Sequence, residues 1–117
     1  MQVLSAAGRP LTPDQVDPDG TGWVEHLRTA DLSCGTYVVP AGGTDGQDPH
    51  TEDEIYVCTA GRATLWTPTG SCAVEPGSVV FVAANEEHRF VDVTEDLTVL
   101  VVFGPAEYSR RPEGATA

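Results

Sequence analysis

Two histidines and one glutamate are the side chains of this sequence with the clearest potential for chemistry. His50 and Glu54 lie four residues apart at the entry to an apolar segment, and His88 follows a later turn. Metal binding needs such Lewis-basic side chains to converge from different strands, because neighbouring positions on one strand point to opposite faces. Two imidazoles and a carboxylate suit divalent iron, manganese, nickel, cobalt or zinc. We therefore expect these three residues to bind a divalent metal cofactor.

The alternative interpretation places the same residues at the surface. His50 would then be a solvated loop histidine, Glu54 an exposed acid in the run EDE, and His88 a surface histidine beside Arg89. Motif matches of this kind carry a risk of false positives. The other acids near these positions are expected to form a solvated rim, and they are Glu52, Asp53, Glu86 and Glu87.

Strands separated by turns must position these side chains. Residues 23–27 and 32–40 have strand character, and the polar segment AGGTDGQDPHTEDE then leads into the strand-like run IYVCTAG. ATLW, SCAVEPG, SVVFVAA, RFVDV and LTVLVVF continue the pattern, and only AEYSRR near the C-terminus is compatible with one helical turn. About eight or nine short strands with turn signals between them predict an all-β antiparallel sandwich or barrel.

Composition divides the chain into three parts. Residues 1–22 contain Pro and Asp-Gly turn signals and are expected to form an arm laid over the barrel. Residues 23–104 hold the strand pattern, and residues 105–117 are expected to form a C-terminal tail that is frayed after Pro112. The length of 117 residues fits one domain with one hydrophobic core.

Two glycine-punctuated motifs in this sequence resemble those of the cupin superfamily. The first is Gly, five residues, His-x-His, three or four residues, Glu, six residues, Gly; the second is Gly, five residues, Pro-x-Gly, two residues, His, three residues, Asn. The matching positions are Gly42, His50, Glu54 and Gly61 in the first motif, and Gly77 and His88 in the second. The resemblance implies a cupin-type double-stranded β-helix, or jelly-roll barrel, with the metal inside. It also implies a homodimer, which would close exposed sheet edges.

The sequence departs from these motifs at four positions. Asp48 stands where the family has its first histidine ligand, and Pro, Gly and Asn of the second motif are replaced by Ala83, Asn85 and Asp92. Asp48 is a candidate fourth ligand, which would bring the charge of the site to zero, or a candidate general base beside an open position. It is also interpretable as a simple turn residue before a proline. Gln47 is a second candidate for the vacant ligand position.

Strand parity places further side chains beside the predicted metal. Tyr56 and Cys58 lie two and four residues after Glu54, so the three should share one face of a strand. Phe90 follows His88 by two residues and should share its face in the same way. Tyr56, Cys58 and Phe90 are candidates for contact with a substrate, and Tyr56 is also a candidate for a catalytic role. Each is also an ordinary residue for filling the interior of a barrel, and core packing is the favoured interpretation.

These features together predict a metal-dependent enzyme that acts on a small organic molecule. In the superfamily that the motifs resemble, dioxygenase, isomerase and decarboxylase chemistries are all compatible with a substrate that chelates the ion through two oxygens. The alternative is a non-catalytic module that binds a small molecule, with a structural metal or none.

Composition and charge limit the partners and the compartment. The formal net charge is −12 and lysine is absent, so neither nucleic acid nor an anionic membrane surface is an expected partner. The three cysteines are widely spaced without a CxxC pair, and residues 1–9 lack the features of a secretory signal. We expect a cytoplasmic protein.

Overall fold

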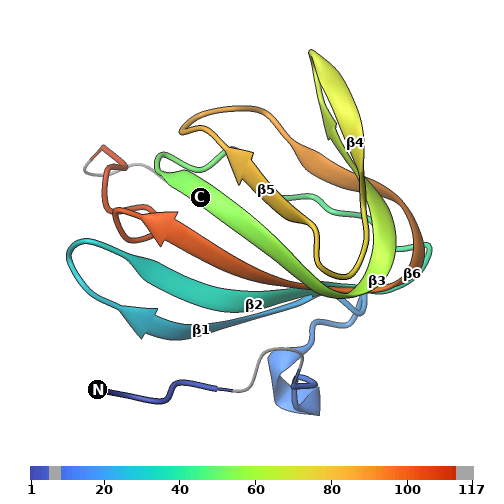
Figure 1. Ribbon diagram of the computed structural model, residues 1–117. Coiled ribbons are helices and arrows are strands. Elements are labelled where there is room, and N and C mark those ends of the chain that lie inside the picture. Colours follow the sequence, from blue (N-terminus) through green and yellow to red (C-terminus); the bar gives the residue numbers. More distant parts are fainter. Residues whose placement is uncertain (6–8, 113–117) are drawn as a thin grey trace.

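Segments rich in valine and threonine form six strands in the part of the chain that the computed structural model describes, residues 1–5 and 9–112 (Figure 1). The strands are β1 (Gly22–Arg28), β2 (Ser33–Val39), β3 (Asp53–Thr67), β4 (Gly70–Val74), β5 (Val79–Val82) and β6 (Arg89–Gly104). One 3-10 helix, η1 (Pro13–Gln15), precedes them, with a proline at its start. The prediction of an all-β fold is confirmed.

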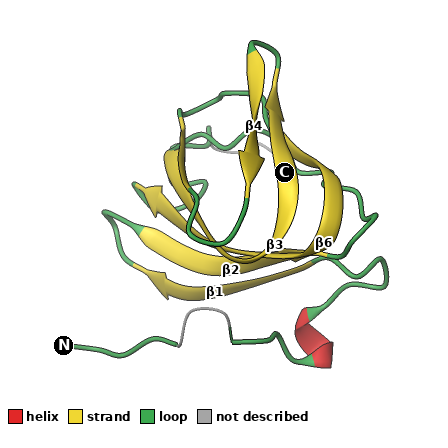
Figure 2. Cartoon of the chain, turned by 45° about the vertical axis from the view of Figure 1, so that its right-hand side comes forward, coloured by secondary structure: helices red, strands yellow, loops and turns green. Residues whose placement is uncertain are grey.

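All of the strand pairs are antiparallel and belong to one sheet. The order is β1-β2-β6-β3-β4, and β5 pairs with the first half of β3. β3 and β6 curve strongly, so that the sheet wraps around an interior (Figure 2). The starts of the antiparallel β3 and β6 lie at opposite ends of their ladder, where Asp53 pairs with Gly104 and Trp66 with Arg89. The curvature and the turn after β5 bring the two motif segments together, with a hydrogen bond from Asn85 to His50.

β3 and β6 are longer than the sequence predicted. IYVCTAG and ATLW form one strand, as do RFVDV and LTVLVVF, so the expectation of about eight or nine strands was wrong. The pairing between β3 and β6 shifts register three times between Cys58 and Thr64, which lets both strands bend without ending. Gly61 lies in this bend with φ +89°, and a Cβ there would meet the carbonyl oxygen of Asp96 at 2.1 Å. Only glycine fits that position.

Alternating side chains of the long strands fill the interior. On β6, Leu97, Val99, Val101 and Phe103 are each almost fully buried. On β3 the inward positions include Glu54, so a carboxylate is held in an otherwise apolar interior. Such a group is costly to bury unless it is paired or binds a cation, which makes this end of the interior the candidate site.

The segment after β6 folds into consecutive turns instead of the helical turn that AEYSRR allows. Backbone hydrogen bonds run from Ser109 to Ala106 and from Arg111 to Tyr108. The frayed end predicted after Pro112 lies outside the described residues, and the division into arm, barrel and tail stays a prediction. Among the described residues, no helix is long and apolar enough to cross a membrane.

Candidate metal centre

The three predicted ligands meet at one buried point at the end of the sheet. His88 Nε2 lies 2.8 Å from Glu54 Oε1, and His50 Nδ1 lies 3.6 Å from the same oxygen. One ligand atom from each residue lies within 4.8 Å of the other two. The residues are only 6%, 2% and 2% exposed for His50, Glu54 and His88. The surface interpretation of these residues is therefore wrong.

Strand pairing and one backbone hydrogen bond bring the two motifs together. Glu54 pairs with Val82 of β5 on one side and with Phe103 of β6 on the other, which fixes its direction. The backbone N–H of Asn85 donates to the carbonyl of His50 at 2.7 Å, so the turn before His88 is tied to the segment before β3. Asn85 replaces the glycine of the second motif and adopts φ +64°, a left-handed conformation that asparagine tolerates better than most residues.

Each histidine has one ring nitrogen directed away from the centre and engaged by an acceptor. His88 Nδ1 donates to the carbonyl of Glu86 at 2.7 Å, so its Nε2 faces Glu54. His50 Nε2 contacts Glu107 Oε2 at 2.8 Å, so its Nδ1 faces the centre. Donation at the outer nitrogen leaves the inner nitrogen as the one available for an ion.

Two buried atoms of the centre lack a hydrogen-bond partner among the described residues. They are His50 Nδ1 and Glu54 Oε2. Leaving a buried polar atom unpaired costs about 1–3 kcal/mol, and more when the group is charged. A divalent cation would satisfy both atoms at once, and two imidazoles with a carboxylate are a donor set that such ions accept. The residues present therefore fit the metal that the sequence predicts.

Charge pairing holds the centre ionised when no cation is bound. Burial lowers the pKa of His50, but the nearby carboxylates of Glu107 and Glu54 outweigh that effect and raise it to about 9. Burial also lowers the pKa of His88, and its contact with Glu54 again reverses the direction. Burial raises the pKa of Glu54, but the two histidines bring it below its usual value. Positive charge beside Glu54 is thus favoured, and an ion would replace the histidine protons.

Tyr56 contributes a neutral hydroxyl to the centre, at the position that strand parity predicted. Its oxygen lies 3.0 Å from His88 Nε2 and accepts a hydrogen bond from the Gln47 amide at 3.1 Å. The amide also donates to the buried carboxylate of Asp45 at 2.8 Å. Burial and the charge of Glu54 raise the pKa of Tyr56 well above its usual value, so the hydroxyl keeps its proton. It can therefore donate a hydrogen bond beside the centre.

Gln47 lines the cavity at the centre, whereas its neighbour Asp48 is exposed and lies outside the ligand group. The roles predicted for Asp48, as ligand or base, and for Gln47, as ligand, stay predictions.

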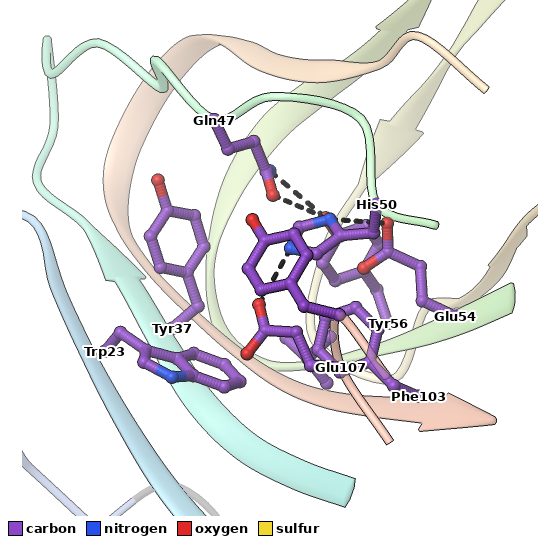
Figure 3. Close-up of a pocket in the computed structure, with 10 residues that line it drawn as sticks. Trp23, Tyr37, Gln47, His50, Glu54, Tyr56, Phe103 and Glu107 are labelled. Carbon is purple, nitrogen blue, oxygen red and sulfur yellow. Dashed lines mark hydrogen bonds and ion pairs between the residues drawn. The ribbon is translucent and has the colours of Figure 1, made fainter. Parts of the chain in front are cut away.

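A cavity of about 150 Å³ opens beside the centre and has largely aromatic walls (Figure 3). The aromatic residues that line it are Trp23, Tyr37, Tyr56, Phe103 and Tyr108. Cys58 and Phe90 are buried in the core and are not among the lining residues, and Phe90 packs edge-on against Tyr56 with ring centroids 4.9 Å apart. Their predicted contact with substrate stays a prediction.

Sequence reasoning missed three residues at the centre. Glu107 and Tyr108 were assigned to the tail, yet both line the cavity and contact His50. Glu52 was expected in a solvated rim, and that expectation was wrong. It is fully buried and accepts hydrogen bonds from the backbone of Tyr108 and Arg110 at 2.5 and 2.9 Å. Its spacing of two from Glu54 was a parity signal for burial.

Solved structures of other proteins share this architecture. An RmlC-like cupin with a double-stranded β-helix fold from Methanocaldococcus jannaschii superposes with a TM-score of 0.66 at 18% identity, covering 76% of this chain and 84% of that one. A chain from crystal structures of the DMSP lyases RdDddP and RnDddQII gives a TM-score of 0.67 at 25% identity, covering 82% of this chain and 54% of that one. The predicted double-stranded β-helix is confirmed.

Sequence comparison identifies the family. The uncharacterized protein SCO3923 of Streptomyces coelicolor is 41% identical over 97 residues, which cover 83% of this chain and 91% of that protein. The pattern of the cupin domain matches residues 35–103, which include all three candidate ligands. The chain therefore belongs to the cupin domain family.

Proposed function

We propose that this protein is a metal-dependent cupin enzyme that acts on a small organic molecule bound beside His50, Glu54 and His88. The observation that carries the proposal is the pair of buried, unpartnered ligand atoms, His50 Nδ1 and Glu54 Oε2. Both residues line the aromatic cavity, so a bound ion and a bound molecule would be neighbours.

A divalent ion held by these residues would act as a Lewis acid toward an oxygen of the substrate. The chain itself supplies orientation and a proton donor. Aromatic side chains line much of the cavity, and the Gln47 amide donates a hydrogen bond to the Tyr56 hydroxyl. Tyr56 is the candidate for moving a proton, because its hydroxyl is neutral and lies beside His88.

The cavity supports a small substrate, and dioxygenation, isomerisation and decarboxylation are the reactions that we propose to test. The likeness to a chain from the DMSP lyase structures adds a lyase reaction to that set. Fold alone does not choose among these classes, because one fold hosts many chemistries. A panel of enolic, catecholic and carboxylic compounds, followed by oxygen uptake and product analysis, separates them.

Metal content of the purified protein tests the proposal. Protein exposed to iron, manganese, nickel, cobalt or zinc should retain one ion per chain, and His88→Ala should lose it. His26→Ala is the matched control, because His26 lies on β1 and hydrogen bonds to Thr36 away from the centre. Wild-type protein that retains none of these ions, or His88→Ala that keeps full stoichiometry, would overturn the metal centre.

A non-catalytic binding module is the second candidate function. The contact of Glu107 and Tyr108 with His50 favours it, because side chains packed on this histidine reduce the open coordination positions around a bound ion. Two results together would favour this module over the enzyme. The bound ion would have no coordination position open to an added chelating compound, and no compound of the panel would be turned over.

We also propose that a second copy of this chain covers the outer face of β3 and β5. Ile55, Val79 and Phe81 are 40%, 67% and 61% exposed there, and Ile55 pairs directly with Phe81. Exposed apolar patches of this kind mark interaction surfaces. The molecular mass measured by light scattering should be that of a dimer, and it should fall to that of a monomer in Phe81→Ser. A wild-type monomer would overturn the pairing.

We also propose that the protein is cytoplasmic, which its three free thiols support.

A further inference from the structure

We propose that Glu107 is a positioning residue of the metal centre, which accepts the Nε2 proton of His50 and thereby directs Nδ1 at the ion. The proposal rests on the metal centre of the proposed function and adds to it a residue from outside the two cupin motifs. It makes the segment after the last strand a working part of the site.

The contacts of His50 carry this inference. Glu107 Oε2 lies 2.8 Å from His50 Nε2, and the carboxylate is itself mostly buried, with 15% of its side chain exposed. The Tyr108 ring stacks on the imidazole, with centroids 5.0 Å apart and planes 20° apart. The Phe103 ring lies 4.7 Å from it. The two rings thus fix the plane of the imidazole, and the carboxylate fixes the direction of its Nε2 atom.

The two histidines must use different ring nitrogens for the same ion. His88 has Nδ1 engaged by a backbone carbonyl and presents Nε2, whereas His50 has Nε2 engaged by Glu107 and presents Nδ1. A carboxylate that accepts the outer N–H of a metal-binding histidine sets its tautomer and makes the inner nitrogen a better donor. The packed rings of Tyr108 and Phe103 set the plane of the imidazole but not its tautomer. Without Glu107, the tautomer of His50 is not specified.

Several hydrogen bonds hold Glu107 in this position. Its backbone N–H donates to Ser33 Oγ at 2.8 Å, and its carbonyl accepts from Arg28 at 2.9 Å. The next turn is anchored by Glu52, which accepts from two backbone N–H groups of residues 108–110. Glu52 lies two residues before Glu54, so one short segment carries both a metal ligand and the anchor of the residue that orients another ligand.

The conformation of Tyr108 agrees with such an anchor. Its φ is +60°, which a bulky residue rarely adopts and which costs about 1–3 kcal/mol. The hydrogen bond from its backbone N–H to a buried Glu52 oxygen offsets part of this cost. The turn that delivers Glu107 is therefore held by buried contacts on both sides of the strained residue.

Zinc affinity of the metal-free chain tests the role of Glu107. Glu107→Ala should bind Zn²⁺ about 10- to 100-fold more weakly than wild type. Glu107→Gln should lose less, since its amide oxygen still accepts the histidine proton. Glu95→Gln is the matched control, because Glu95 is an exposed acid paired with Arg62 and should leave the affinity unchanged.

Nitrogen NMR shifts of the zinc-loaded protein provide a readout that a merely structural residue would not move. His50 should bind zinc through Nδ1 in wild type, and Glu107→Ala should show a second population bound through Nε2. Unchanged affinity in Glu107→Ala, while His88→Ala loses zinc, would overturn the positioning role and leave the metal centre intact. Binding of His50 through Nε2 in wild type would overturn it as well. Wild type that binds no zinc and no other ion would instead overturn the proposed function.

Discussion

The two sides of the metal centre are built in different ways. Around His88, the contacts come from the barrel itself, namely the carbonyl of Glu86, the hydroxyl of Tyr56 and the carboxylate of Glu54. Around His50, the outer acceptor and the stacking ring are side chains of residues 107 and 108, beyond the last strand. The barrel side depends on the fold, whereas the His50 side depends on a docked segment. Removal of a ligand on the first should abolish metal binding, whereas changes to the docked residues of the second should tune it.

Removal of a barrel-side ligand should have the largest effect. His88→Ala or Glu54→Ala takes away one of three donors and leaves the others as unpaired buried groups, so Zn²⁺ affinity should fall by more than about 1000-fold. Titration against a competing chelator measures this loss. A tenfold change in Kd corresponds to about 1.4 kcal/mol of binding free energy. An affinity within tenfold of wild type would mean that the ion binds elsewhere.

Tyr56→Phe should separate chemistry from metal binding on the same side. It removes one hydroxyl and keeps the ring that packs against Phe90. If Tyr56 moves a proton, turnover should fall by about 100-fold while zinc affinity stays near that of wild type. Steady-state kinetics beside a metal titration checks both values. A matching loss in both would show that the hydroxyl serves the ion and not the reaction.

Glu52→Gln should weaken the docked side without touching a ligand. The amide keeps only one acceptor oxygen for the backbone N–H groups of Tyr108 and Arg110, so the turn should detach more often. We expect faster trypsin cleavage after Arg110 and a loss of zinc affinity of about tenfold. Glu87→Gln, at an exposed acid, is the control. Wild-type cleavage and affinity in Glu52→Gln would mean that the segment is held by other contacts.

The smallest expected effect is a pH dependence of the metal-free protein. The pKa of His50 is raised from 6.5 to about 9 in the folded chain, so protonation of His50 favours folding. This contribution is complete below pH 6.5 and is lost as the pH rises through about 9. Melting temperature in chelator should therefore decline across that window, and less so in Glu107→Gln. A flat or rising profile would contradict the charge pairing at His50.

The convergence of the candidate ligands was predictable because their spacing is a local feature of two motifs next to strands. Gly-punctuated motifs placed His50, Glu54 and His88 together, and alternation from Glu54 identified Tyr56. The length of β3 was not predictable in the same way. Its bend at Gly61 looks like a turn in sequence, whereas register shifts let the strand continue through it.

Glu107 escaped prediction because its contact with His50 spans 57 residues and follows no period. Residues after a final strand carry no alternation that tells whether they return to the barrel. Glu52 was a different case, since its parity with Glu54 indicated burial, but the charge-rich run around it suggested solvent. The backbone N–H groups of the docked turn, together with the Thr51 hydroxyl, satisfy the oxygens of this buried side chain.

Anomalous diffraction from crystals of the metal-loaded protein tests the central claim most directly. We predict one strong peak about 2.0–2.2 Å from His50 Nδ1, His88 Nε2 and a carboxylate oxygen of Glu54. A peak only at surface carboxylates would contradict the account. So would a metal-loaded crystal with no peak between these three side chains.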